Sequence, residues 1–102
     1  MVKLRSEAVD KLFETILNLK TIDECYDFFE DLCTVKEIQD MSQRLETAAL
    51  LLKGLSYQKI GEQVNISSAT IGRVNKCINY GSGGYKLAIE RLGKGSEEDD
   101  DQ

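Results

Sequence analysis

The sequence predicts an all-α protein of about six helices, arranged around a central helix-turn-helix. Three observations support this fold class. The 102-residue chain contains no proline, which would interrupt helices. No part of it shows the sustained polar and apolar alternation typical of strands, and its apolar residues instead recur at intervals of three and four. A chain of this length has room for one core, so we expect a single helical domain over residues 1–94.

Two helices are expected before residue 34. The first carries an apolar stripe with helical spacing, made of Val9, Leu12, Phe13, Ile16 and Leu17. The stretch Thr21-Ile22-Asp23-Glu24 then reads as a capping box. In that motif Thr21 accepts a hydrogen bond from the amide of Glu24, and the Glu24 carboxylate accepts one from the amide of Thr21. A second apolar stripe follows, made of Ile22, Cys25, Tyr26, Phe29, Leu32 and Cys33.

The third helix is the longest and opens with the same signal, Thr34 followed three residues later by Glu37. Gly54 is expected to end it. Its predicted inner face is formed by Ile38, Met41, Leu45, Ala48 and Leu52. Ser56 and Ser67 are predicted to cap two further helices, which reach about Val64 and Tyr80. A flexible break over Gly81–Gly84 and a short last helix over Tyr85–Leu92 complete the set.

Charge is distributed unevenly along a chain whose net charge is −5. Residues 1–40 hold 5 basic and 10 acidic side chains, whereas residues 41–94 hold 8 basic and 3 acidic ones. Nucleic acid responds to such a local basic region rather than to net charge. Residues 95–102 hold 5 acidic side chains and are expected to form a disordered acidic tail. The tail either keeps the protein soluble or competes with DNA for the basic region.

Several classes of function are excluded by what the chain lacks. Cys25, Cys33 and Cys77 are odd in number and widely spaced, which argues against a disulfide framework. There is no histidine and no CxxC pair, so neither a metal site nor the commonest general base is expected. No nucleophile–base pair or phosphate loop is evident, so we expect no enzymatic activity. The N-terminus does not resemble a signal peptide, and we expect a cytoplasmic protein.

The stretch Tyr57–Lys76 fits a helix-turn-helix at the positions that its geometry restricts. Gly61 is expected where the two helices touch, because a larger residue would push them apart. Asn65 is expected at the sharp turn, because asparagine tolerates the left-handed conformation. Apolar side chains are expected to seal the wedge between the helices, namely Ile60, Val64, Ile66, Ile71 and Val74.

The outer face of this motif has the chemistry that a major groove requires. Short hydroxyl side chains can donate to or accept from base edges, and methyl groups can meet a thymine methyl. Long basic side chains can reach phosphates or a guanine, while the preceding helix crosses the DNA backbone. The predicted DNA-binding residues are Gln58, Lys59, Ser67, Ser68, Ala69, Thr70, Arg73 and Lys76.

These residues predict a sequence-specific double-stranded DNA-binding regulator of transcription, acting as a repressor. The alternative is a protein-interaction module that docks a partner in the transcription machinery without sequence-specific DNA binding. The wide apolar faces before Gly54, which include Phe13, Tyr26, Phe28 and Phe29, favour a homodimer. An ordinary monomer core remains the other interpretation of those faces.

The stretch Leu32–Leu92 resembles the Trp repressor domain. The similarity runs through Leu51-Leu52-Lys53-Gly54, Ser56-Tyr57-Gln58-Lys59-Ile60 and Ala69-Thr70-Ile71-Gly72-Arg73. The whole chain most resembles the YerC/YecD group within the Trp repressor-like superfamily. The resemblance implies an intertwined homodimer. In it, residues 1–55 would supply the dimerisation helices, residues 56–80 the helix-turn-helix and residues 81–94 the C-terminal helix.

The resemblance also bears on small-molecule effectors. In Trp repressor two arginines line the tryptophan pocket, and they match Arg44 and Arg73 here. Trp repressor has a glycine beneath the indole ring, and that position is Val74 in this chain. A β-branched side chain there would fill the space of the indole, so we expect no tryptophan co-repressor. Arg44 and Arg73 could still clamp another carboxylate or form structural ion pairs.

Overall fold

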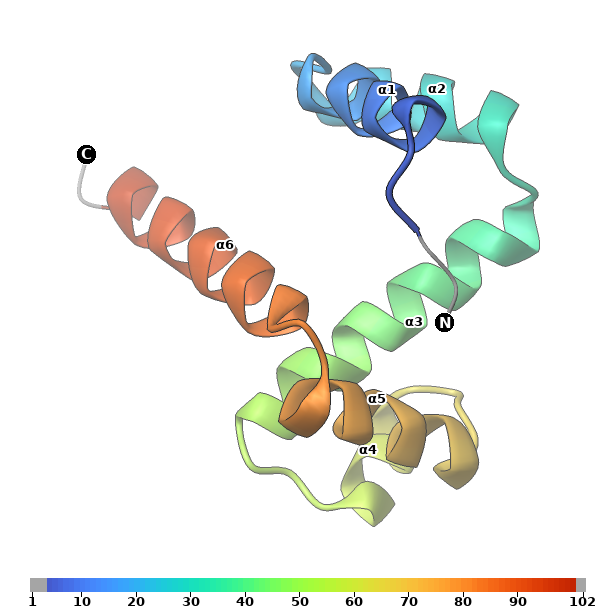
Figure 1. Ribbon diagram of the computed structural model, residues 1–102. Coiled ribbons are helices and arrows are strands. Elements are labelled where there is room, and N and C mark those ends of the chain that lie inside the picture. The colour runs from blue at the N-terminus through green and yellow to red at the C-terminus, as the bar shows by residue number, and fades with distance from the viewer. Residues whose placement is uncertain (1–3, 101–102) are drawn as a thin grey trace. The chain divides into compact units, whose positions relative to one another are not determined.

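Figure 1 shows the computed structural model, which describes residues 4–100 and, within them, the side chains as far as Lys94. The described elements are α1 (Glu7–Leu17), α2 (Ile22–Leu32), α3 (Val35–Leu52), α4 (Tyr57–Gln63), α5 (Ser68–Tyr80) and α6 (Gly84–Asp100). Residues 4–100 contain helices and no strand, which confirms the predicted all-α class. Among these helices, none combines the length and apolar character needed to cross a membrane.

The two predicted capping boxes form, with one difference. At the start of α3, the amide of Glu37 donates to Thr34 Oγ1 at 3.1 Å, and the amide of Thr34 donates to Glu37 Oε1 at 2.9 Å. At the start of α2, the amide of Glu24 donates to Thr21 Oγ1 at 3.1 Å, as predicted. The Glu24 carboxylate, however, accepts from the amide of Lys20 at 2.8 Å. The predicted bond to the Thr21 amide was wrong by one residue, because the glutamate side chain reaches further back.

Gly54 ends α3 through its backbone conformation. Its φ of 90° lies in the left-handed region that glycine adopts without strain. The amide of Gly54 donates to the carbonyl of Leu51 at 3.0 Å, and the amide of Leu55 donates to that of Leu50 at 3.1 Å. This pair of bonds is the Schellman motif, which satisfies carbonyls left free at the helix end. The predicted stop at Gly54 is therefore confirmed.

The chain forms two compact units, Met1–Ile38 and Gln39–Gln102, and the boundary falls inside α3. In the first unit, no described residue is buried. Its aromatic residues Phe28 and Phe29 contact each other edge to face, with ring centroids 5.5 Å apart. This unit therefore leaves much of its apolar surface uncovered within one chain.

The core lies in the second unit, where α4 and α5 pack beside the C-terminal part of α3 (Figure 1). Ile60, Val64 and Ile71 form its centre. The partly buried residues that pack around this centre are Leu50, Leu51, Leu55 and Ile66. Because α3 meets the core through Leu50 and Leu51, only part of its predicted inner face is covered.

Several residues of the predicted inner face of α3 are exposed in one chain. Ala48 is fully buried, but Met41, Leu45 and Leu52 are 38–43% exposed. Thr47, which was not predicted to be inside, is fully buried. The buried pair Thr47 and Ala48 shows that the covered side of α3 is rotated relative to the predicted stripe.

The last helix is longer than predicted. It begins at Gly84 and continues to Asp100, whereas the sequence indicated a helix over Tyr85–Leu92 and a disordered tail from Gly95. Single glycines weaken a helix interior by only about 1 kcal/mol each and do not stop a helix as proline does. The backbone over residues 95–100 is therefore helical, and Asp101 and Gln102 lie outside the described residues.

Candidate DNA-binding surface

Helices α4 and α5 form the predicted helix-turn-helix, and each begins at the predicted serine. Ser56 Oγ accepts from the amide of Lys59 and Ser67 Oγ from the amide of Thr70, both at 3.2 Å. These caps satisfy amides that have no partner within the helix. The wedge between the helices is sealed as predicted, because Ile60, Val64, Ile71 and Val74 are at most 3% exposed. Ile66 completes it as a partly buried residue.

The turn between the helices is built differently from the prediction. Among the described residues, no amino acid other than glycine has a positive φ, so Asn65 does not adopt the left-handed conformation. Val64, at the end of α4, and Ser67, at the start of α5, are both extended. An extended connection changes the chain direction over several residues, and no single residue has to take the whole bend.

The predicted packing role of Gly61 was also wrong. Gly61 is exposed, and a Cβ added there would meet no atom within 4 Å. The helix period explains why. Ile60 and Val64 are four residues apart and share the inner face of α4, whereas Gly61 is rotated by about 100° from Ile60. The two helices therefore meet through the isoleucine and the valine.

The outer face of α5 is open to solvent. Ala69, Arg73 and Lys76 are exposed and recur at the i, i+4, i+7 spacing of one helix face. Tyr80 continues this face and is 84% exposed, although we did not predict it as a contact residue. Its spacing of seven residues from Arg73 was the signal that would have identified it. On α4, the predicted residues Gln58 and Lys59 are exposed as well.

The hydroxyl groups at the start of α5 differ in their roles. Ser67 Oγ lies 2.9 Å from Thr70 Oγ1, in addition to accepting from the Thr70 amide. The hydroxyls of Ser67 and Thr70 are therefore hydrogen-bonded to each other, and these bonds stabilise the first turn of the helix. Ser68 is exposed beside them. Of the three predicted hydroxyl contacts, Ser68 is thus the one placed to meet a ligand directly.

Arg73 and Val74 are neighbours on α5 that differ in burial. Arg73 is exposed on the outer face of α5, whereas Val74 is 1% exposed on the inner face. Arg44, the other residue of the expected effector pocket, is half-buried on α3. The inner side of α5 at this point is thus occupied by the valine side chain.

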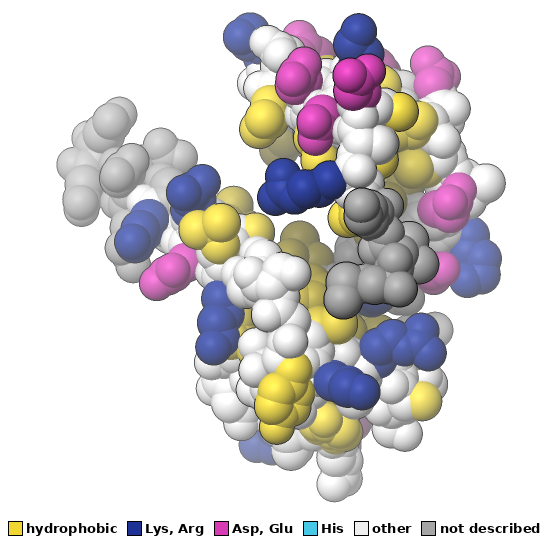
Figure 2. Space-filling model, in the orientation of Figure 1, with side chains coloured by type: hydrophobic (Ala, Val, Ile, Leu, Met, Phe, Trp, Pro, Cys, Tyr) yellow, Lys and Arg dark blue, Asp and Glu magenta, His cyan; other side chains and the backbone are white. Residues whose placement is uncertain are grey.

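Charge is distributed unevenly over the described surface, as the sequence indicates. Acidic side chains gather on the first unit, and the visible face of the second unit carries mostly Lys and Arg (Figure 2). Within residues 41–94, where 8 basic side chains stand against 3 acidic ones, lie α4 and α5. The helix-turn-helix therefore lies in a segment with more basic than acidic side chains, and such an excess attracts phosphates.

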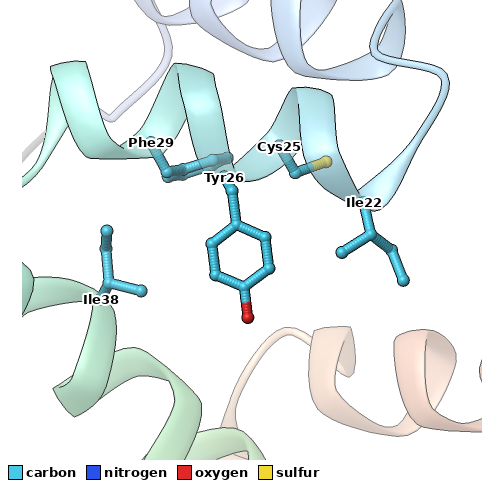
Figure 3. Close-up of a pocket in the computed structure, with 5 residues that line it drawn as sticks. All are labelled: Ile22, Cys25, Tyr26, Phe29 and Ile38. Atoms are coloured by element: carbon cyan, nitrogen blue, oxygen red, sulfur yellow. The ribbon is translucent and has the colours of Figure 1, made fainter.

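Each unit also contains an apolar hollow. In the first unit, Ile22, Cys25, Tyr26 and Phe29 of α2 and Ile38 of α3 surround a pocket of about 190 Å³ (Figure 3). In the second unit, a hollow of about 300 Å³ lies between α3 and α6, lined by residues that include Leu45, Ala49, Ile89 and Leu92. Both are open rather than enclosed, and both are lined mainly by hydrocarbon.

The fold and this surface define a helix-turn-helix protein, and comparison with known proteins gives the family. The profile of the Trp repressor protein family matches residues 7–93. The protein YerC of Bacillus subtilis strain 168 is 50% identical over 90 residues, which are 88% of this chain and 86% of YerC. The chain therefore belongs to the Trp repressor family.

Two solved structures of similar proteins support both the family and the fold. A TrpR-like protein from Eubacterium eligens is 51% identical, with a TM-score of 0.85 over 88% of this chain and 93% of that one. A Trp repressor homologue from Staphylococcus aureus, described as putative in its own structure report, is 43% identical. It also has a TM-score of 0.85, over 88% of this chain and 90% of that one. The predicted Trp repressor-like fold is thus confirmed.

Proposed function

We propose that this protein is a sequence-specific, double-stranded DNA-binding regulator of transcription. Helix α5 enters the major groove, and α4 lies across the DNA backbone. One observation carries the proposal: α5 buries Ile71 and Val74 on one side and exposes Ala69, Arg73 and Lys76 on the other. A helix fixed to the core by one face presents the other face rigidly, as readout of bases requires. Membership of the Trp repressor family supports this function.

Each exposed residue has a role that its chemistry permits. Ser68 and Ala69 lie in the first turn, where a recognition helix comes nearest to the bases. A serine hydroxyl can donate or accept there, and an alanine methyl can contact the C5-methyl of thymine. Arg73 and Lys76 contact phosphates or a guanine, and on α4 Lys59 contacts the backbone. Occupation of a site near a promoter would exclude polymerase, so we expect repression.

Binding to duplex DNA across a range of salt concentrations tests this function. Changing Arg73 and Lys76 to alanine should weaken binding, because side chains that neutralise phosphates release counterions from the DNA. The slope of log K against log salt should fall by about 0.9 for each phosphate that the variant no longer neutralises. Lys11→Ala, on α1, is the matched control and should bind like the wild type. A wild-type protein with no salt-sensitive binding to any duplex would instead favour the protein-interaction module.

We also propose that the protein acts as a homodimer. Leu17 is 82%, Ile22 75% and Tyr26 60% exposed on the first unit, an extent of apolar surface that monomers rarely leave open. The hollow between α3 and α6 offers an apolar surface of the kind that such side chains fill. Acidic side chains outnumber basic ones in residues 1–40, and basic ones outnumber acidic ones in residues 41–94. The N-terminal helices of one copy are therefore opposite in charge to residues 41–94 of another.

The oligomeric state tests the dimer directly. Sedimentation equilibrium should give twice the mass of one chain for the wild type. Leu17→Glu should shift the protein toward monomer, because it places a charge in the apolar contact. Lys11→Glu, on the same helix, alters charge without touching that surface and should leave the dimer intact. A monomeric wild type at micromolar concentration would refute the dimer.

We propose further that DNA binding does not require tryptophan. The buried side chain of Val74 occupies the inner side of α5 at the position where Trp repressor has the glycine beneath the indole. Isothermal titration calorimetry with tryptophan should detect no binding, and added tryptophan should not alter affinity for DNA. A micromolar dissociation constant would contradict this proposal.

A further inference from the structure

Gly72 lies inside α5 without a structural reason in the free chain. It is the fifth of the 13 residues of the helix and is half-buried. A Cβ added to it would meet no atom within 4 Å, and its φ is not in the left-handed region. Glycine inside a helix is destabilising relative to alanine, because it loses more conformational freedom on folding. The glycine therefore weakens α5 with no gain that packing or backbone geometry explains.

Its position in the helix places Gly72 beside the proposed contact residues. Gly72 follows Ser68 by four residues and precedes Lys76 by four, so the three share one side of α5. Ala69 and Arg73 lie next to that side and are exposed. The exposed side chains at the start of α5, Ser68 and Ala69, are thus short, and the longer basic ones, Arg73 and Lys76, lie further along the helix.

We propose that Gly72 is a specificity-determining residue at which the backbone of α5 lies directly against the base edges of DNA. This inference rests on the proposed DNA-binding function and deepens it. Glycine is used where a backbone must approach a ligand closely. A methyl group at this position would hold the helix away from the bases. The hydrogen bonds of Ser68 would then lengthen and weaken, since such bonds are effective only within a narrow distance.

The same reasoning distinguishes Gly72 from other glycines within helices. Gly61 and Gly93 also have open space for a Cβ. Gly61, however, belongs to α4, which in the proposed mode reaches the phosphates through longer side chains such as Lys59. Gly93 belongs to α6, outside the helix-turn-helix. Gly93→Ala is therefore a matched control, because it makes the same chemical change in another helix.

The experiment compares wild type, Gly72→Ala and Gly93→Ala. Thermal unfolding should give a melting temperature about 4 °C or more above wild type for both variants, because alanine favours helix. Affinity is then measured for duplexes selected by the wild type from genomic fragments and for a random duplex of equal length. Gly72→Ala should bind the selected duplexes about tenfold more weakly and the random duplex unchanged. Gly93→Ala should bind both as the wild type does.

Three results would overturn the inference. Undiminished preference of Gly72→Ala for the selected duplexes would show that its Cβ does not meet the DNA. An equal loss in Gly93→Ala would assign the effect to helix stabilisation. A lower melting temperature for Gly72→Ala would reveal a structural reason for the glycine. Failure of the proposed function itself has a separate signature, namely a wild-type protein that selects no duplex.

Discussion

At the scale of single residues, Ser67 illustrates how a side chain can act through another. Its hydroxyl is used by the amide and the hydroxyl of Thr70, so we assign it to positioning α5 rather than to contact with bases. Ser67→Ala should lower affinity for all duplexes and destabilise the protein by about 1 kcal/mol. Ser67→Asn should restore both, because asparagine caps helices equally well. Binding titrations and thermal unfolding measure these effects. If Ser67→Asn restored stability but not affinity, Ser67 would instead contact the bases directly.

Thr47 is a second residue whose environment yields a prediction. It is fully buried, and its hydroxyl has no hydrogen-bond partner in the described structure. A buried polar group without a partner costs free energy, so Thr47→Val should raise the free energy of unfolding by about 1 kcal/mol. Thr47→Ser keeps the hydroxyl and removes a methyl, so it should destabilise. Urea denaturation measures both, and a destabilised Thr47→Val would show that the hydroxyl is used.

Single-residue roles were the least predictable from sequence. The buried wedge residues were predicted correctly, because their apolar spacing allows one orientation of each helix. Gly61 and Asn65 were misread, because a residue type permits a conformation or a close approach without requiring it. Whether the space beside Gly61 is filled depends on the rotation of α4 against α5, which is set by long-range packing.

At the scale of elements, the start of α3 depends on an ionised side chain. The backbone amide of Thr34, and then its hydroxyl, hold the pKa of the Glu37 carboxyl below its usual 4.5. A lowered pKa means that the carboxylate stabilises the fold above pH 4.5 and loses this effect as pH falls through the lowered value. Glu37→Ala should therefore be less stable than wild type near pH 7, with a difference that shrinks in acid. Thermal unfolding between pH 7 and 3 measures this, and a difference that stays constant over that range would contradict it.

Alanine is expected to have opposite effects on stability at two glycines, Gly81 at the end of α5 and Gly61 inside α4. A Cβ at Gly81 would clash with the carbonyl oxygen of Cys77, whereas one at Gly61 would meet open space. Gly81→Ala should therefore destabilise the protein by about 1–3 kcal/mol, since the backbone must shift. Gly61→Ala should stabilise it by about 1 kcal/mol through helix propensity. Guanidinium denaturation compares them, and a destabilised Gly61→Ala would reinstate a packing role for that glycine.

Elements were predicted well because their starts are encoded locally. Each capping serine or threonine lies within a few residues of the amides that it satisfies, so Thr21, Thr34, Ser56 and Ser67 could be identified from sequence. The stop at Gly54 was equally local. The extent of α6 was not, because no residue after Leu92 forbids a helix, and the glycines there only weaken one.

At the scale of the whole molecule, composition and periodicity sufficed for the fold class, and the resemblance of short motifs indicated the family. They did not reveal how little of the chain one copy buries. The buried hydrophobic residues of the described structure are Ala48, Ile60, Val64, Ile71 and Val74, all in the second unit. The apolar stripes of α1 and α2 were correctly seen in the sequence. Their spacing could not show which chain covers them.

The sparse core of one chain gives the proposed dimer a consequence for stability. If the apolar faces of α1 and α2 are covered by a second copy, folding and association become one equilibrium. We therefore expect the melting temperature to rise with total protein concentration, which calorimetry over a hundredfold dilution series would measure. A melting temperature independent of concentration would contradict this. In a cell, scarce chains would lack partners, spend longer unfolded and be degraded by proteases. The amount of folded protein would then decrease more steeply than the rate at which it is synthesised.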